Sequence, residues 1–155
     1  AGPPGLCRGL CWRPFTPGVP PMLCVGGGPQ ALVWQFVLAL NTWQPVATMG
    51  TADSQEVSAV HWAQPLGRPT ELVAVGAGRD LLIFSLSGDT SALRVEQLAA
   101  LEHEAAVWKV EWDLWGCQVA AATEGQQVHV YKPDLVGAWK KLAWVQGQAP
   151  EAASE

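Results

Sequence analysis

The strongest constraint on this chain is a pattern of short runs that recurs three times, fifty residues apart. Trp12, Trp62 and Trp112 each close a short run of β-type residues. After each tryptophan come a run of small and apolar residues, a run with an aromatic side chain, and a further extended segment. Four short strands in a unit of fifty residues are typical of a β-propeller blade, so the sequence predicts three blades.

The second, third and fourth strands of each predicted unit follow from the same pattern. The second strands fall at 23–28, 72–78 and 119–122, the third at 32–36, 82–84 and 128–131, and the fourth at 43–49, 92–98 and 139–145. Segment 91–101 also contains helix formers behind Ser91, which could serve as an N-cap. We interpret this segment as a strand, because the blade scheme requires one there.

The most regular unit spans 107–132. Apolar and polar residues alternate through 107–112, which is the period of a half-buried strand. This alternation predicts one face made of Trp108, Val110 and Trp112 and an opposite face made of Val107, Lys109 and Glu111. Seven side chains are expected to support the blades: Trp12, Trp62, Phe84, His103, Trp108, Trp112 and Tyr131.

The composition favours a folded protein that does not grip nucleic acid. Of the 155 residues, 49% are hydrophobic and 15% are charged, a balance that permits a packed core. The nine tryptophans suit sheet faces and protein interfaces. The net charge is −5 and the nine basic residues are scattered, whereas phosphate binding needs clustered Lys and Arg. We therefore expect no direct nucleic-acid contact.

The cysteines and the longest apolar run indicate neither a metal site nor a membrane segment. Cys7, Cys11, Cys24 and Cys117 do not have the spacing of a paired zinc site, and no histidine lies near the first two in sequence. We interpret them as small buried hydrophobes in a reducing compartment. The most apolar run, 31–40, is about half the length of a membrane span. No cofactor or metal is expected.

Three blades alone cannot close a ring, because propellers typically have four to eight. We expect 1–147 to be a partial propeller, with blades at about 5–50, 56–100 and 103–147, and to belong to a longer protein. Its uncovered outer faces predict that the chain alone aggregates or is poorly stable. The small, polar and acidic residues 148–155 are expected to form a disordered tail.

Five short motifs occur in a fixed order along the chain: Pro20-Pro21-Met22, Leu66-Gly67-Arg68, Ile83-Phe84, Val107-Trp108-x-Val110-x-Trp112 and Trp139-Lys140. In this order they resemble the last three blades of the Seh-one family of WD-repeat nucleoporins, relatives of the coat protein Sec-thirteen. The similarity extends to about Gly147. The Sec-thirteen family is similar over the last blade, and the first two motifs favour Seh-one.

The third blade departs from the usual WD-repeat pattern. His103 matches the histidine found near the start of many blades, but Glu124-Gly125 replaces the usual turn aspartate and Tyr131-Lys132 replaces the terminal Trp-Asp. These departures put the hydrogen-bonded His–Asp network of the family in doubt. We expect this blade to depend on ring packing by Trp108, Trp112 and Tyr131 instead.

The resemblance implies a non-catalytic scaffold. The family forms an open six-bladed propeller, and an α-solenoid nucleoporin donates a further blade in trans. That pair belongs to the Y-shaped outer-ring coat of the nuclear pore, and the same family protein belongs to the GATOR-two complex. The implied locations are the nuclear envelope, the kinetochore and the cytoplasmic face of the lysosome. The edge that accepts the donated blade lies near the family's N-terminal blade, so no partner-binding residue is assigned here.

Two alternatives stay open. One is a Sec-thirteen-like vesicle-coat propeller, and the other is a propeller enzyme or small-ligand binder. The sequence offers little chemistry for the latter, because it has no G-x-S-x-G elbow and Gly76-Ala77-Gly78 lacks the third glycine of a dinucleotide loop. His61, His103 and His129 are expected to be ordinary structural residues rather than catalysts.

Overall fold

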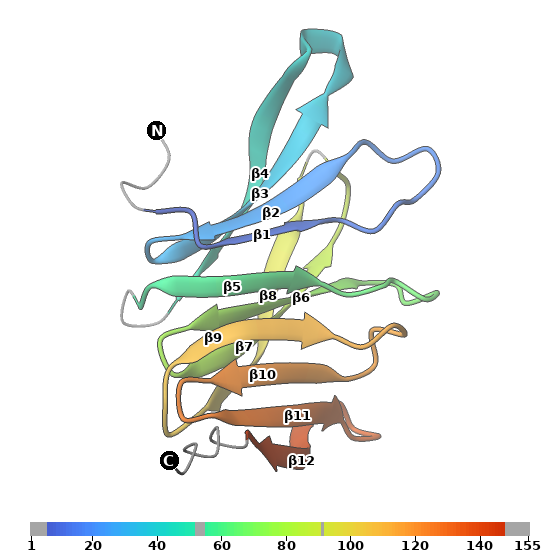
Figure 1. Ribbon diagram of the computed structural model, residues 1–155. Helices are drawn as coiled ribbons and strands as arrows, with labels where there is room; N and C mark the ends of the chain where they lie inside the picture. Colours follow the sequence, from blue (N-terminus) through green and yellow to red (C-terminus); the bar gives the residue numbers. More distant parts are fainter. Residues whose placement is uncertain (1–5, 52–54, 91, 148–155) are drawn as a thin grey trace, which may run out of the picture.

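A computed structural model describes residues 6–51, 55–90 and 92–147 and shows three antiparallel sheets stacked in a row (Figure 1). Each sheet has four strands, which pair in sequence order. The secondary structure of the described residues is all β apart from one short 3-10 helix. The described sheets form an open row and no closed ring. The predicted all-β architecture, a partial propeller of three four-stranded blades, is therefore confirmed. The predicted tail, 148–155, lies outside the described residues.

Each sheet is one blade. Blade 1 contains β1 (Gly9–Trp12), β2 (Met22–Gly27), β3 (Gln30–Val37), η1 (Leu38–Leu40) and β4 (Thr42–Gly50). Blade 2 contains β5 (Val57–Trp62), β6 (Glu71–Ala77), β7 (Asp80–Ser87) and β8 (Arg94–Glu102). Blade 3 contains β9 (Val107–Trp112), β10 (Val119–Thr123), β11 (Gln127–Pro133) and β12 (Trp139–Gln146). Segment 91–101 could be read as a helix or a strand, and β8 confirms the strand interpretation over its described part. No helix among the described residues has the length and apolar character needed to cross a bilayer.

The core consists of two apolar seams, one between each pair of neighbouring blades. The blade 1–blade 2 seam buries Met22, Cys24, Ala31, Val33, Met49, Val57, Val60, Trp62, Val73, Val75, Ala77, Leu82, Phe84 and Leu86. The blade 2–blade 3 seam buries Ala59, Ala63, Leu72, Ala74, Leu81, Ile83, Val107, Val110, Trp112, Val119, Ala121 and Tyr131. Each blade thus depends on its neighbour for burial, as expected for repeat units that cannot cover their own faces.

Blade 2 supplies side chains to both seams because successive residues of a strand point to opposite faces. Along β6, Val73 and Val75 face blade 1, whereas Leu72 and Ala74 face blade 3. Six consecutive residues of β6 and six of β7 are buried. This double coverage explains why these two strands read as continuous apolar runs.

Glycines allow the second strand of one blade to approach the first strand of the next. A Cβ added at Gly26 would lie 2.5 Å from Val57 Cγ1, and one added at Gly76 would lie 2.9 Å from Val107 Cγ1. The hydroxyl of Ser58 lies 2.6 Å from the carbonyl oxygen of Val107 and ties the same two blades together. The first strands therefore pack directly against the neighbouring blade.

The predicted strand phase of 107–112 is wrong at Trp108. The β9–β10 register pairs Lys109 with Ala122 and Val107 with Thr123, so Trp108 is an extra residue without a partner. Such a bulge shifts the alternation by one position. Val107, Val110 and Trp112 are buried as a result, and the Trp108 side chain is 57% exposed. Trp108 therefore does not take part in the ring packing that was expected of it.

The two tryptophans of β9 provide a matched test of this geometry. Trp112 is 5% exposed and packs in the blade 2–blade 3 seam, so Trp112→Ala should lower the free energy of unfolding by about 3–5 kcal/mol. Trp108→Ala removes the same side chain from an exposed bulge and should cost less than about 1 kcal/mol. Urea unfolding followed by circular dichroism measures both. Equal losses would contradict the bulge.

Candidate protein-interaction site

The two ends of the blade row expose the faces that other blades bury. In each blade, six residues of the first three strands form two cross-strand rows on the face that points toward the preceding blade. In blade 2 these rows are Val60–Val75–Leu82 and Trp62–Val73–Phe84, and in blade 3 they are Val110–Ala121–His129 and Trp112–Val119–Tyr131. We call the equivalent face of blade 1 the leading face, and its rows are Leu10–Val25–Leu32 and Trp12–Leu23–Trp34.

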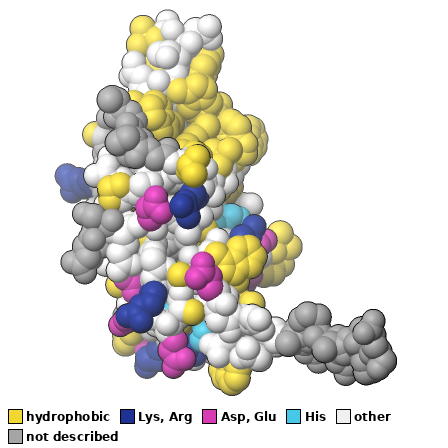
Figure 2. All heavy atoms as spheres, turned by 60° about the vertical axis from the view of Figure 1, so that its left-hand side comes forward, with side chains coloured by type: hydrophobic (Ala, Val, Ile, Leu, Met, Phe, Trp, Pro, Cys, Tyr) yellow, Lys and Arg dark blue, Asp and Glu magenta, His cyan; other side chains and the backbone are white. Residues whose placement is uncertain are grey.

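The leading face is apolar and, among the described residues, has no covering blade. Leu10 and Trp12 are each 61% exposed, whereas their equivalents in blade 2, Val60 and Trp62, are buried. The Trp12 ring is braced from the side by Trp43, with the ring centroids 5.9 Å apart. Figure 2 shows hydrophobic side chains gathered over the upper, blade 1 end of the molecule, while charged side chains concentrate lower down. An apolar face of this kind is suited to packing against a further blade.

The opposite end of the row, on blade 3, has a different character. We call this face the trailing face, and its rows are Lys109–Ala122–Val128–Val145 and Glu111–Ala120–Val130–Ala143. Its outer strands are apolar, but Lys109 and Glu111 stand where blade 2 has Ala59 and His61. The Lys109 ammonium lies 4.0 Å from the Glu111 carboxylate, and both side chains are largely exposed.

Two hydrogen bonds join the first strands of blades 2 and 3. The Trp112 backbone N–H donates to His61 Nδ1 over 2.7 Å, and the Trp112 indole N–H donates to the His61 carbonyl over 3.1 Å. One blade earlier, the equivalent residues are Cys11 and Trp62. The pKa of the Cys11 thiol is lowered, chiefly by the Cys24 thiol and less by the Trp62 and Cys24 backbones, while burial raises it. The direct hydrogen bonds at this position join blades 2 and 3, through His61 and Trp112.

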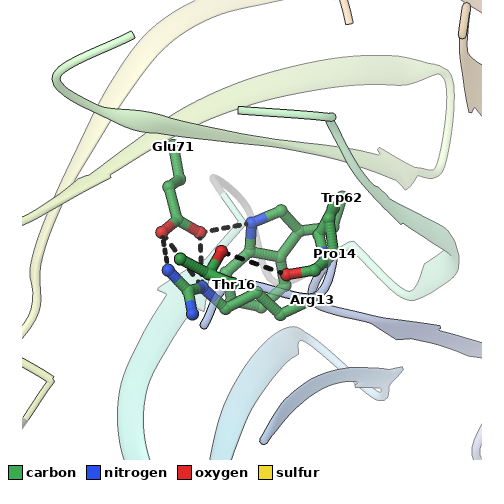
Figure 3. A network of polar contacts seen from close by, with 5 residues as sticks. All are labelled: Arg13, Pro14, Thr16, Trp62 and Glu71. Carbon is green, nitrogen blue, oxygen red and sulfur yellow. Dashed lines mark hydrogen bonds and ion pairs between the residues drawn. The ribbon is translucent and has the colours of Figure 1, made fainter. Parts of the chain in front are cut away.

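A partly buried ion pair also crosses the blade 1–blade 2 seam (Figure 3). Arg13 Nε lies 3.0 and 2.8 Å from the two carboxylate oxygens of Glu71, and Arg13 Nη2 contacts the same carboxylate. The indole of Trp62 donates to Glu71 over 2.8 Å. The Arg13 and Glu71 side chains are 11% and 24% exposed, so the pair is hydrogen-bonded and largely removed from water. This network fixes the orientation of Trp62 within the seam.

His103 anchors blade 3 through a network that replaces the usual aspartate. Its Nδ1 lies 3.0 Å from the Arg79 carbonyl and its Nε2 lies 3.0 Å from the Tyr131 hydroxyl. With Nδ1 donating to the carbonyl, Nε2 accepts from the tyrosine. The two hydrogen-bond partners of His103 are a carbonyl and a tyrosine hydroxyl, so this network differs from the family's His–Asp pair. His103 lies in the β8–β9 connection, not in a strand.

The residues expected to support the blades divide into two groups. Trp62, Phe84, His103, Trp112 and Tyr131 are buried, whereas Trp12 and Trp108 are exposed. Cys24 is buried as expected, but Cys7 and Cys117 are exposed, so the prediction of four buried cysteines is wrong for these two. The Arg13–Glu71 pair and the acceptor role of His61 were missed. Cys11, His61 and Glu111 each stand directly before one of the three tryptophans that are spaced by fifty residues. This spacing is the sequence signal that could have pointed to His61 as an acceptor.

A shallow hollow beside the third blade offers no evident chemistry. His129 Nδ1 is buried there without a hydrogen-bond partner, and Arg79 and Glu102 pair with each other across 2.8 Å. The residues that line the hollow are Arg79, Glu102, His103, Glu104, Gln127, His129, Lys141 and Trp144. Within the described part of the chain, no three His, Cys, Asp or Glu side chains come together as a metal site.

The seam histidine makes stability depend on pH. Burial lowers the pKa of His61, the nearby Glu111 raises it and Lys109 lowers it, with a net lowering. The folded state therefore resists protonation, and stability is full above the ordinary histidine pKa and falls as the pH drops below about 6.5. Protonation would also remove the acceptor for the Trp112 N–H.

We expect the free energy of unfolding to decrease between pH 7.5 and pH 5.5, and His61→Gln to flatten this decrease. Burial lowers the pKa of His103 and His129 in the same direction, so part of the slope should remain in the variant. Chemical denaturation at a series of pH values measures the slope. A slope identical to that of the wild type would contradict the role of His61.

Comparison with known proteins identifies the relatives of this chain. No protein-family model matches it. The chain is 32% identical to Protein SEH1 of Arabidopsis thaliana over 117 residues, which is 72% of this chain and 36% of that protein. It is 23% identical to Nucleoporin SEH1 of Homo sapiens over 159 residues, 91% of the chain and 44% of the relative. It is 24% identical to the protein transport protein SEC13 of Phaeosphaeria nodorum over 74% of the chain and 36% of the relative.

Solved structures share the fold. A chain of the Chaetomium thermophilum Polycomb Repressive Complex 2 bound to GSK126 matches with a TM-score of 0.68 and 10% identity, covering 83% of this chain and 29% of that one. At this identity the likeness concerns the fold alone. The chain spans about 36% to 44% of the length of the curated relatives it matches. Blade architecture and sequence similarity agree: the chain is a SEH1/SEC13-like WD-repeat protein.

Proposed function

We propose that the chain is a non-catalytic interaction scaffold of the nucleoporin type, acting in the outer-ring coat of the nuclear pore. The observation that carries the proposal is a row of blades held together only by apolar face-to-face packing, with Leu10 and Trp12 at 61% exposure each on a further face of the same kind. Faces of this kind are suited to packing against further blades. The similarity to SEH1 nucleoporins supplies the setting.

The proposed principal partner is an α-solenoid nucleoporin that donates a blade in trans. A blade that closes an open ring lies between the first and the last blade, so a blade accepted near the family's N-terminal blade would also cover the trailing face. Lys109 and Glu111 lie at the inner part of this face and would contact the donated strand. Other nucleoporins of the Y-shaped coat would bind the outer surfaces, placing the protein at the nuclear envelope and, during division, at the kinetochore.

The family resemblance extends the proposal to a second complex. The same scaffold would serve the GATOR-two complex at the cytoplasmic face of the lysosome, which relays amino-acid sufficiency to TORC-one. Only the partner would differ, since both settings use the chain as a non-catalytic scaffold. Subunits of the pore coat and subunits of the GATOR-two complex can therefore be told apart in a single affinity purification.

A vesicle-coat role is the second candidate. The similarity to the protein transport protein SEC13 of Phaeosphaeria nodorum covers 74% of the chain and supports it. A coat scaffold of this kind would use the same open faces but a different cage-forming partner. A propeller enzyme or small-ligand binder finds less support, because the hollow near His103 contains mutually paired charges and no assembled catalytic group.

Affinity purification of the tagged chain after mild crosslinking, followed by mass spectrometry, tests these roles. Outer-ring nucleoporins, including an α-solenoid subunit, are the expected co-purifying proteins. Val128→Asp places a charge on the trailing face at a site that is 37% exposed, so it should abolish capture of the solenoid subunit without unfolding the chain. Leu135→Asp, in the fully exposed β11–β12 loop, should leave capture unchanged.

Recovery of vesicle-coat subunits in place of nucleoporins would contradict the pore role and favour the second candidate. Capture of the solenoid nucleoporin that is equally strong with Val128→Asp would mean that the trailing face is not the site. Turnover of a substrate by the purified chain would contradict the non-catalytic reading.

A further inference from the structure

We propose that Cys11 and Cys24 form a reversible disulfide across strands β1 and β2, made by exchange with a small disulfide such as oxidised glutathione. The two cysteines lie inside blade 1, on the side that packs against blade 2. Their geometry therefore depends only on contacts between described strands. Such a bond is independent of the proposed scaffold role and goes beyond it.

The strand register places the two cysteines directly opposite one another. Cys11 pairs with Cys24 in the antiparallel β1–β2 ladder. Two residues further along the same register, the Arg13 backbone N–H donates to the Met22 carbonyl over 2.9 Å. Since hydrogen-bonded pairs recur at every second residue, Cys11 and Cys24 form such a pair as well, with a Cα separation of about 5.5 Å. Disulfides span Cα separations of about 4.4–6.8 Å, so the backbone can accept the bond.

The two thiols also contact each other on the same side of the sheet. Cys24 is fully buried in the blade 1–blade 2 seam, and Cys11 is partly buried against the same apolar cluster. A hydrogen bond between the two side chains is the largest influence on both thiols, and it lowers the pKa of Cys11 and raises the pKa of Cys24. The two sulfur atoms therefore lie next to one another while both cysteines are reduced.

The other two cysteines are not placed to compete for this bond. Cys7 precedes β1, and Cys117 lies in the connection between β9 and β10 of blade 3. Both are exposed, and neither stands opposite a cysteine in the register of the described strands. The strand pairing thus selects Cys11 and Cys24.

The different burial of the two thiols gives them different roles in the exchange. Cys11 retains access to solvent, so its thiolate attacks a small disulfide RSSR, forms a Cys11–S–S–R bond and releases one RS⁻. Cys24 is closed to solvent, and its thiolate attacks the Cys11 sulfur next. The bond from Cys11 to R breaks, and a second RS⁻ leaves. Two protein thiols are oxidised to one disulfide, RSSR is reduced, and the two thiol protons end on the two molecules of RSH.

The hydrogen-bonded position makes this disulfide easy to reduce. The Cβ atoms of directly opposite residues lie about 4.5–5.5 Å apart, with the larger values in hydrogen-bonded pairs, whereas a relaxed disulfide holds them about 3.5–4.5 Å apart. Bond formation must therefore draw β1 and β2 together. A strained disulfide is reduced more readily than a structural one, which suits a transient bond in a reducing compartment.

The bond would fix the strand on which blade 1 meets blade 2. β1 has only four residues, and Cys11 is the third of them. β1 packs closely on β5, since a Cβ added at Gly9 would lie 2.9 Å from the Val60 backbone nitrogen. A covalent tie from β1 to β2 should suppress local opening of β1 and so stabilise the contact between the two blades.

Treatment of the folded, affinity-bound chain with oxidised glutathione, followed by thiol blocking and mass spectrometry, tests the proposal. Attachment to the resin keeps the chains apart, so that disulfides between chains do not form. Chymotrypsin cleaves after Trp12 and so separates the two cysteines for analysis. The expected product is a Cys11–Cys24 disulfide, which reverts to two thiols when reduced glutathione is added in about tenfold excess.

Matched variants separate the roles of the two thiols. Cys24→Ala should stop the reaction with one glutathione on Cys11, and Cys11→Ser should leave the buried Cys24 unmodified. Cys7→Ser and Cys117→Ser change exposed cysteines and should leave the disulfide intact. In the oxidised wild type, hydrogen–deuterium exchange should slow at least about twofold in β1 and stay unchanged in β9.

Four outcomes would overturn the proposal. Recovery of Cys11 and Cys24 as blocked thiols after oxidation of the wild type would show that they do not pair. A disulfide from Cys11 to Cys7 would place the bond elsewhere, and glutathione on Cys24 in Cys11→Ser would reverse the roles. Unchanged exchange of β1 would contradict the fixing of that strand. None of these results affects the nucleoporin partner test, since that test reads the identity of co-purifying subunits.

Discussion

The whole structure depends on the packing of one blade's first strand against the second strand of the blade before it. Valine and tryptophan side chains of the first strand reach a glycine in the neighbour, and the added Cβ distances of 2.5 Å at Gly26 and 2.9 Å at Gly76 show how little space remains. No blade has a core of its own, because both apolar clusters lie between blades. The fold is therefore a series of contacts between neighbouring blades.

Polar groups determine the alignment of these contacts. The Arg13–Glu71, His61–Trp112 and Ser58–Val107 contacts each cross a seam and join residues 49 to 58 positions apart in sequence. Apolar packing tolerates sliding, whereas hydrogen bonds in a largely dry seam are costly to misplace.

Strand order and blade number were predictable from the sequence, because the fifty-residue period and the glycine-bearing runs repeat. Burial was less predictable. Trp12 and Trp62 occupy equivalent positions in their blades. Trp62 is buried because blade 1 covers it, whereas Trp12 is exposed among the described residues. The prediction that Trp108 is buried was wrong for a local reason, since a single bulge residue reverses the phase of the strand. The His103–Tyr131 bond joins residues 28 apart whose meeting depends on the third blade having formed.

The central claim is that coverage on both faces by neighbouring blades, rather than any property of a blade alone, stabilises this fold. Hydrogen–deuterium exchange resolved by strand tests it most directly. The account predicts that amides of β6 and β7 in the middle blade exchange most slowly, because these strands are buried on both faces. The equivalent strands β2 and β3, and β10 and β11, are covered on one face and should exchange faster. Equal protection in all three blades would contradict the account.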